Sequence, residues 1–347
     1  MKYLICQEWI NTKTNHAGIK HMCQLLIKKY PTEYEVIISK DYLGMINKKI
    51  LWGKVIARFY ILVIHPCIDF FTAFFIYKKL NSGDTVYLLE YCTPYYSQTI
   101  IAKFLRKRTN KKKSFTINGM LHLVPDDFMK HYSAEIFKSY IDLLDNVITL
   151  GSSLTHFLEN TIHINQRRIK TTLHYVDSTY YKPNTSGQHN DILRIIVMGN
   201  MKRDYTLLKE IIANATTDVT FLICQGTKDL SMLFQNMNNV KLYGFLNEDD
   251  LLHLMQSSDI SLNVMQDTIG SNVIVTSMAV GLAMINSDVG SIRDYCNEDG
   301  ALYCDNKNPK SFSDAINYLY ENREKLNELK SKSLYYSKSF SIDKIHL

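Results

Sequence analysis

The stretch that decides the fold is Gln266 to Cys296, QDTIGSNVIVTSMAVGLAMINSDVGSIRDYC. An apolar run leads into it, and small and branched side chains follow at helical spacing until Gly281. These patterns predict a strand, a loop, a helix, a second strand and a second loop, at residues 260–264, 267–272, 273–280, 283–287 and 288–291. Strands that alternate with helices in this way are typical of a doubly wound α/β domain.

The first loop of this stretch predicts an anion site. Its Gly270-Ser271-Asn272 turn opens a helix, so several backbone N–H groups there have no partner within the helix. The positive end of the helix dipole lies at the same place, and phosphate is the usual anion for such a site. A helix that is merely capped by Ser271 or Asn272 is the alternative.

The order of these elements resembles the donor-binding core of retaining GT-B glycosyltransferases, most closely glycosyltransferase family four (glycosyl transferases group 1). The similarity rests on the helix segment Thr276 to Gly281 (TSMAVG) and on the Ser-Asp-x-Gly-x-x-Arg-Asp pattern from Ser287 to Asp294. It covers nearly the whole chain and is most specific over residues 193–300. The fold class that it implies is α/β, with two Rossmann-like doubly wound domains that face each other across a cleft.

The resemblance implies donor-sugar contacts in the first loop and the helix after it. The family carries a Glu-x7-Glu pair there, and this chain has Thr276 at the second glutamate and Thr268 or Asp267 at the first. Neither glutamate is present as Glu. The donor-binding residues expected in this segment are Asp267, Gly270, Ser271, Asn272, Val273 and Thr276.

A second donor-binding segment is expected at the start of the C-terminal domain. A strand over residues 193–198 runs into a glycine turn with cations, Gly199 to Asp204. A positively charged turn at the end of a strand suits a diphosphate. Gly199, Lys202 and Arg203 are therefore predicted donor contacts. By resemblance, the loops with Gly226, Gly244, Phe245 and Leu246 flank the nucleobase.

The resemblance places further candidates in the N-terminal half. Gly18, in the loop after the first strand, is at the position where the family's backbone approaches the donor diphosphate. Asn118 is at the family's histidine, in a turn expected after a strand at 114–117, and His122 lies one helical turn further on. Both are candidate catalytic residues, and a structural role for His122 is the alternative.

The domain organisation follows from these matches. Residues 1–175 are expected to form an acceptor-binding domain, 176–190 a linker, and 191–347 the nucleotide-sugar-binding domain. An amphipathic helix is expected over 315–329, and relatives continue into a further helix, so the C-terminus is expected to be truncated. Seven cysteines without a CxxC spacing favour reduced thiols in a cytoplasmic protein over a disulfide framework or a zinc site.

Charge is distributed unevenly. The chain has a net charge of +6, and residues 1–150 hold 21 Lys and Arg against 12 Asp and Glu. Six of these cations fall within Arg106 to Lys113. This distribution favours either an anionic partner for the first domain, such as a lipid surface, or an ordinary solvated face. Nucleic acid is the weaker partner, because the cluster lacks interleaved aromatic residues and the second half is acidic.

A long apolar and aromatic stretch runs from Ile50 to Leu80 with lysines at both ends. His65, Pro66 and Asp69 interrupt it, so a continuous spanning helix is not expected. Buried helices of the first domain are favoured, and an interfacial membrane segment is the alternative.

The resemblance implies a hexosyltransferase that uses a UDP- or GDP-linked sugar, retains configuration, and needs no metal or cofactor. The expected acceptor is a glycan or a lipid-linked molecule in the synthesis of cell-surface polysaccharide or glycoconjugate, at the inner face of the membrane. A GT-B-shaped nucleotide-sugar epimerase and a non-catalytic GT-B partner subunit are the alternatives. No Asp-x-Asp metal motif occurs in the chain.

Overall fold

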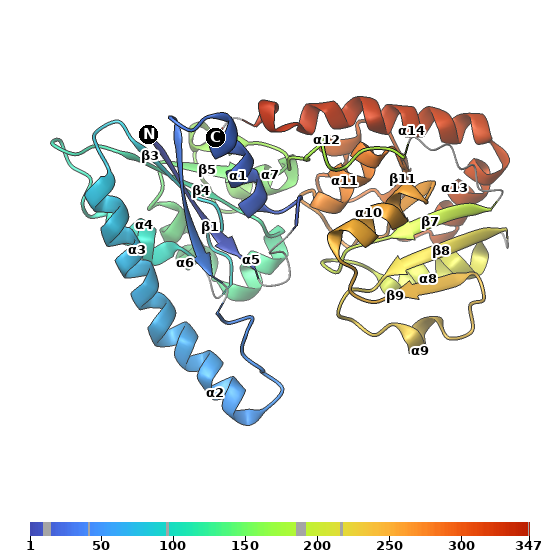
Figure 1. Ribbon diagram of the computed structural model, residues 1–347, viewed down its shortest axis with the longest axis horizontal. Coiled ribbons are helices and arrows are strands. Elements are labelled where there is room, and N and C mark those ends of the chain that lie inside the picture. Colours follow the sequence, from blue (N-terminus) through green and yellow to red (C-terminus); the bar gives the residue numbers. More distant parts are fainter. Residues whose placement is uncertain (10–14, 41, 95–96, 185–191, 216–217, 346) are drawn as a thin grey trace. The chain divides into compact units, whose positions relative to one another are not determined.

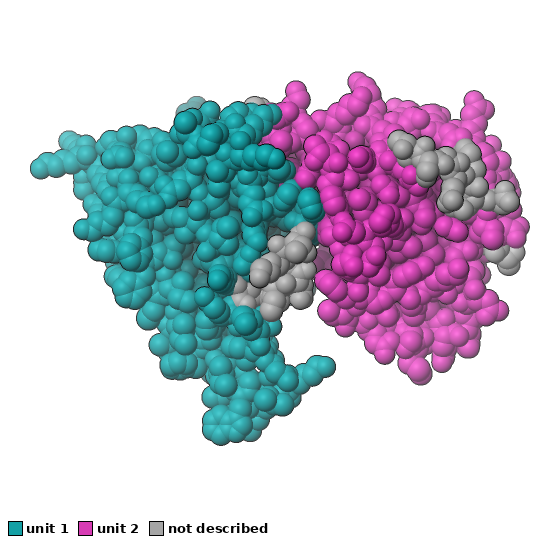
Figure 2. Space-filling view, in the orientation of Figure 1, with its two compact units in different colours: residues 1–172, 346–347 teal, residues 173–345 magenta. Residues whose placement is uncertain are grey.

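The computed structural model describes residues 1–9, 15–40, 42–94, 97–184, 192–215, 218–345 and 347. The chain divides into two compact units, residues 1–172 with 346–347 and residues 173–345 (Figure 2). Of the linker expected at 176–190, residues 185–190 lie outside the described residues. Each unit contains a parallel six-stranded sheet with helices around it (Figure 1).

The sheet of unit 1 has the order β2-β1-β3-β4-β5-β6, and every pair of neighbours is parallel. Its central strands are buried apolar runs, as expected for a sheet covered on both faces. The strands are β1 (Lys2–Glu8), β2 (Tyr34–Lys40), β3 (Thr85–Leu88), β4 (Thr116–Met120), β5 (Asn146–Thr149) and β6 (Ile169–Thr171). The helices are α1 (Ile19–Lys29), α2 (Leu51–Phe59), the π-helical segment Tyr60–Ile64, α3 (His65–Lys79), α4 (Thr99–Arg106), α5 (Pro125–His131), α6 (Ala134–Ile141), α7 (Ser152–Asn160) and the 3-10 turn Gln166–Arg168.

Unit 2 has the order β12-β11-β10-β7-β8-β9, again parallel throughout. Its strands are β7 (Leu193–Val197), β8 (Val219–Cys224), β9 (Val240–Tyr243), β10 (Ile260–Asn263), β11 (Ala283–Ser287) and β12 (Leu302–Cys304). Its helices are α8 (Tyr205–Asn214), α9 (Ser231–Phe234), α10 (Glu248–Gln256), α11 (Asn272–Val280), α12 (Ile292–Cys296), α13 (Pro309–Glu321), α14 (Arg323–Ser337) and the 3-10 turns Lys338–Phe340 and Ile342–Lys344. Apolar residues of β7, β8 and β10 pack with those of α8, α13 and α14 into one core.

The strand order reverses at one point in each sheet. In unit 2 the chain runs from β7 outward through β8 to β9, then returns to β10 on the other side of β7. The loops after β7 and β10 therefore leave neighbouring strands in opposite directions. In unit 1 the corresponding point lies between β1 and β3. Ligands of open parallel sheets bind at such switch points, outside the carboxyl ends of the strands.

Three expectations about the elements are corrected. The segment from Leu51 to Lys79 is one uninterrupted helical run of 29 residues, with the π-helical segment in its middle. In this segment the His65 N–H donates a hydrogen bond to the Tyr60 carbonyl, five residues earlier in the chain. This wider turn lies immediately before Pro66. Asn118 lies inside β4, where a turn was expected. The single helix expected at 315–329 is two helices, α13 and α14, which meet at Asn322.

Candidate functional site

The clearest candidate site lies at the switch point of unit 2 and is built from the loops after β7 and β10. The two loops are joined by backbone hydrogen bonds, from the Gln266 N–H to the Lys202 carbonyl (2.8 Å) and from the Asp204 N–H to the Val264 carbonyl (3.2 Å). Arg203 and Met265 form an isolated bridge between them. This pairing fixes Arg203 directly beside the end of β10.

Arg203 is the most unusual side chain of this site. It is 9% exposed, and its Nε and Nη1 atoms are buried without a hydrogen-bond partner among the described residues. Burial lowers the pKa of its guanidinium to about 10, which leaves it charged at neutral pH. A buried guanidinium without a partner is costly for the protein, and its N–H groups suit the oxygens of a phosphate.

Close packing around Gly199 brings the first turn of α11 to the same place. Gly199 has a φ of +86°, and a Cβ built on it would lie 3.0 Å from Arg203 Nη2 and 3.3 Å from Val273 Cγ2. Val273 belongs to the first turn of α11, whose leading N–H groups have no partner within the helix. Ser271, the residue before this helix, also has a buried hydroxyl without a partner among the described residues. An unpaired cation, a helix N-terminus and an unpaired hydroxyl together make this a candidate site for an anion.

The loop before α11 is held rigidly. The Thr268 hydroxyl accepts a hydrogen bond from the Gly270 N–H (2.9 Å), and the Thr268 carbonyl accepts one from the Ser291 N–H (2.8 Å). The buried Tyr295 packs against Gly270 and donates its hydroxyl to the Ile269 carbonyl (3.4 Å). This loop is therefore arranged before any ligand binds, which reduces the entropy cost of binding.

The structure places the other predicted residues of unit 2 as follows. Asp267 accepts the Thr268 N–H (2.7 Å), and Asn272 lies in the first turn of α11. Lys202, with a φ of +53°, lies in the loop beside Arg203. Thr276 is buried, and its hydroxyl donates to the Asn272 carbonyl (2.8 Å), a bond to the preceding helical turn. Where the family has its second glutamate, this chain therefore has a hydroxyl already used by its own helix.

The loops after β8 and β9 are only partly gathered at this site. Gly226 lies against Asn200, since a Cβ on it would be 2.5 Å from Asn200 Nδ2. Gly244 has no atom within 4 Å of such a Cβ, and Phe245, next to Leu246, is 62% exposed. Lys228, which was not predicted from the sequence, donates to the Asn200 carbonyl (3.3 Å) and adds a further cation near the loop that holds Lys202 and Arg203. Its place after β8, the strand next to β7, was the available signal.

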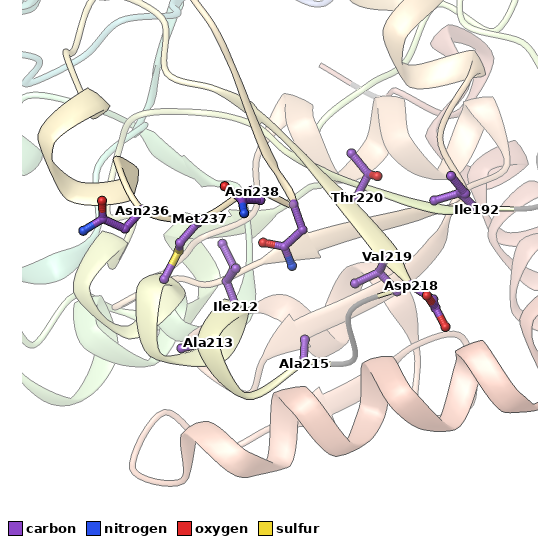
Figure 3. A pocket seen from close by; sticks show the side chains of 11 residues that line it. Ile192, Ile212, Ala213, Ala215, Asp218, Val219, Thr220, Asn236, Met237 and Asn238 are labelled. Carbon is purple, nitrogen blue, oxygen red and sulfur yellow. The ribbon is translucent and has the colours of Figure 1, made fainter.

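A separate pocket of about 600 Å³ opens at the other edge of the unit 2 sheet (Figure 3). It is lined by Ile192, just before β7, by Val219 and Thr220 at the start of β8, and by the turn at Asn236 to Asn239. No lining side chain is a buried polar group without a partner among the described residues. The pocket therefore lacks the features that mark the Arg203 site.

The switch point of unit 1 holds a buried carboxyl that the sequence analysis missed. Glu90 follows β3, and its Oε1 accepts a hydrogen bond from the Trp9 indole after β1 (3.3 Å). Burial raises the pKa of Glu90 to about 7. His122 forms a hydrogen bond through its Nε2 with the carbonyl of Leu89, the residue before Glu90 (2.5 Å), and burial lowers the pKa of this imidazole to about 4. The histidine is therefore neutral at pH 7.

The two other unit 1 candidates are Asn118 and Gly18. Asn118 is buried in the sheet and accepts a hydrogen bond from the Asn146 amide (2.9 Å), so its side chain stabilises the packing of β4 with β5. Gly18 precedes α1 with a φ of −84°, so no left-handed turn requires a glycine there. A Cβ on Gly18 would have no atom within 4 Å.

Because the pKa of Glu90 is raised in the folded protein, we expect its contribution to the free energy of unfolding to fall as pH rises. Below its unfolded pKa of 4.5 the carboxyl is protonated in both states. Between pH 4.5 and about 7 the unfolded chain ionises while the folded carboxyl stays protonated, so stability is lost over this window. Glu90→Gln keeps an acceptor for Trp9 and should reduce the loss between pH 4.5 and 8 by about 3 kcal/mol. Urea unfolding of both proteins at the two pH values checks this, and equal losses would contradict it.

Comparison with known proteins agrees with this fold. The chain aligns with a glycosyltransferase from Rickettsia africae at 14% identity over 99% of this chain and 95% of that one, with a TM-score of 0.68. It also aligns with a sucrose-phosphate synthase from Thermosynechococcus elongatus at 10% identity over 99% of this chain and 96% of that one, with a TM-score of 0.73. A third structure, Anabaena Alr3699/HepE in complex with UDP-glucose, aligns at 12% identity over 98% and 96% (TM-score 0.67). The fold is therefore GT-B, as predicted.

The sequence match is more local. Residues 192–322 match the model of the family Glycosyl transferases group 1, and no curated protein matches the chain. This match confirms the resemblance where it was most specific, because residues 193–300 lie within it. Both loops of the Arg203 site lie within the matched residues.

Proposed function

We propose that the protein transfers a hexose from a nucleoside diphosphate sugar to a glycan or lipid-linked acceptor with retention of configuration. The observation that carries this proposal is the buried, unpaired Arg203 guanidinium beside the N-terminus of α11. Two positive groups that converge at a switch point match the two phosphates of such a donor. The glycosyl transferases group 1 match over the same residues supports this donor class.

The chemistry assigned to this site is stabilisation of the leaving group. As the bond between the anomeric carbon and the diphosphate oxygen breaks, negative charge develops on the diphosphate. Arg203 and the N–H groups of Asn272 and Val273 are placed to bind that charge, which is the reason to propose transfer without a metal. The acceptor oxygen attacks from the face that the diphosphate leaves, and its proton passes to a diphosphate oxygen. A new glycosidic bond replaces the old one with the same configuration.

The proposed setting is the synthesis of cell-surface polysaccharide or glycoconjugate at the inner face of the cell membrane. The basic character of residues 1–150 supports a membrane location, because an anionic leaflet attracts cations. Uridine is the first nucleotide to test, since the fold neighbour Alr3699/HepE was solved with UDP-glucose.

Donor binding is expected to raise the melting temperature of the protein. A ligand at one hundred times its Kd stabilises the folded state by about 2.7 kcal/mol. The measurement is a thermal-shift panel of UDP-glucose, UDP-N-acetylglucosamine and GDP-mannose, each with and without EDTA. We expect one uridine diphosphate sugar to give the largest shift, unchanged by EDTA.

Two results would contradict the proposal. A shift that EDTA abolishes would remove the metal-independent mechanism. Binding without sugar release to water or to any acceptor would favour a non-catalytic partner subunit. One structural feature bears on this second outcome. Thr276 stands at the position of the family's second glutamate, and its hydroxyl is bonded to the Asn272 carbonyl of its own helix.

A further inference from the structure

The helical run from Leu51 to Lys79 in unit 1 has its apolar and polar faces reversed relative to a helix of a soluble domain. Its mean hydropathy reaches 1.9, and it is long and apolar enough to cross a membrane. The positions that face the unit are mostly small or polar: Gly53, Ala57, Tyr60, His65, Asp69, Ala73 and Ile76. The exposed positions carry large apolar side chains: Leu51, Trp52, Val55, Ile56, Phe59, Leu62, Val63, Ile64, Phe70, Phe71, Phe74 and Phe75.

The π-helical segment keeps this reversal consistent along the helix. Inward positions recur every three or four residues, except for the five-residue step from Tyr60 to His65 across the π-helical segment. Without that step, His65 and Asp69 would rotate toward the outside. They are instead 7% and 3% exposed, and their side chains approach each other at 3.7 Å. The outer face from Phe59 to Phe75 is therefore free of charged side chains.

Such a face requires an apolar environment. Isolated apolar residues on a surface need no explanation, but a continuous band of this kind marks a protein or membrane contact. The polar groups turned toward the protein and the aromatic groups turned outward match a lipid environment more closely than water.

The position of the helix on unit 1 favours a surface contact over a span. α3 packs along α4, where the rings of Phe70 and Phe104 are in edge-to-face contact with their centroids 5.2 Å apart. The ring centroids of Tyr77 and Phe115 are 6.4 Å apart. α2 extends beyond this contact, away from the sheet (Figure 1). Since α3 remains attached to the unit, lipid can reach one side of the helix only.

Cations mark both ends of this face. Lys48, Lys49, Lys54 and Arg58 lie near its first turns, and none of them forms an ion pair with another described residue. Lys78 lies at the last turn, with its amine 5.3 Å from the Phe74 ring. Cations at both ends of an apolar face can reach lipid headgroups while the face between them enters the acyl boundary.

We propose that the outer face of residues 51–79 inserts into the headgroup and acyl boundary of an anionic phospholipid bilayer. The proposal rests on the function proposed above for the reason to be at a membrane, namely a lipid-linked acceptor. Its test measures vesicle binding without donor or acceptor, so that its failure is distinguishable from a failure to transfer sugar.

The test is flotation of the full chain with vesicles of phosphatidylcholine, with and without phosphatidylglycerol. The variants are Phe71→Ser and Phe75→Ser, whose side chains are 58% and 64% exposed. Met232→Ser is the matched control, because Met232 is 75% exposed on α9 of unit 2. We expect each phenylalanine variant to weaken partitioning about tenfold and the control to leave it unchanged. Raising salt from about 0.1 to about 0.5 M should weaken binding severalfold without abolishing it, because salt does not screen apolar insertion.

Trp52 provides a second readout. It is 74% exposed, and Trp9 is the only other tryptophan of the chain. Anionic vesicles should shift the tryptophan fluorescence emission of the protein to shorter wavelengths, and Trp52→Phe should remove this shift.

Four outcomes would overturn the proposal. These are no vesicle binding, equal binding by the phenylalanine variants, self-association of the free protein that Phe71→Ser abolishes, and retention on vesicles after an alkaline wash. The third would assign the face to a second copy of the chain, and the fourth to a membrane span.

Discussion

Arg203→Met is expected to stabilise the ligand-free protein while removing its activity. The guanidinium is buried without hydrogen bonds from Nε and Nη1, and burial lowers its pKa to about 10. Replacing it with an apolar side chain of similar length should raise the free energy of unfolding by about 1–3 kcal/mol at pH 7. Loss of the charge that we propose binds the leaving diphosphate should lower the rate of sugar transfer by about a hundredfold or more.

Chemical unfolding and a transfer assay on the same preparation separate these two effects. Arg194→Met is the control, since Arg194 lies in β7 but outside the loop that carries Arg203. A variant at Arg203 that is both less stable and still active would show that this side chain is structural.

Gly270→Ala is expected to be among the most destabilising small substitutions in unit 2. Gly270 has a φ of +97°, and a Cβ there would lie 2.1 Å from two ring atoms of the buried Tyr295. Backbone strain costs about 1–2 kcal/mol and a forced shift of the ring about 1–3 kcal/mol, so we expect a loss of about 2–5 kcal/mol. Donor binding should weaken as well, because Gly270 lies two residues before α11, whose N-terminus we propose as part of the anion site.

Gly244→Ala is the matched control for this prediction. Gly244 is also a loop glycine of unit 2, but it has no positive φ, and a Cβ added to it would have no atom within 4 Å. Denaturant midpoints of the two variants should therefore differ clearly. A wild-type midpoint for Gly270→Ala would mean that the loop before α11 is less rigid than its hydrogen bonds indicate.

The sequence predicted most of what depends on local pattern. The stretch from Gln266 to Cys296, with the strand before it, folds as β10, a loop, α11 and β11 nearly as expected, because its turn residues and apolar runs agree with the tertiary structure. The helical run from Leu51 to Lys79 was misjudged. Pro66 and Asp69 usually interrupt a helix, but here a π-helical turn precedes the proline and the carboxyl faces the protein.

The site was only partly predictable for a related reason. Arg203 could be proposed from its place after a strand, but its lack of partners depends on which loops meet at the switch point. Glu90 and Lys228 were missed because each follows a strand without a recognisable motif. The contribution of Asn118 to the sheet follows from its partner Asn146, which is distant in sequence.

The most direct test of the account is calorimetric titration with UDP and with uridine, in the wild-type protein and in Arg203→Met. If Arg203 and the N-terminus of α11 bind the diphosphate, the wild-type protein should bind UDP far more tightly than uridine. In the variant this preference should fall by about tenfold or more, because a hydrogen bond to a charged group contributes about 1.5–3 kcal/mol. An unchanged preference for UDP over uridine in Arg203→Met would contradict the assignment of this site to the donor diphosphate.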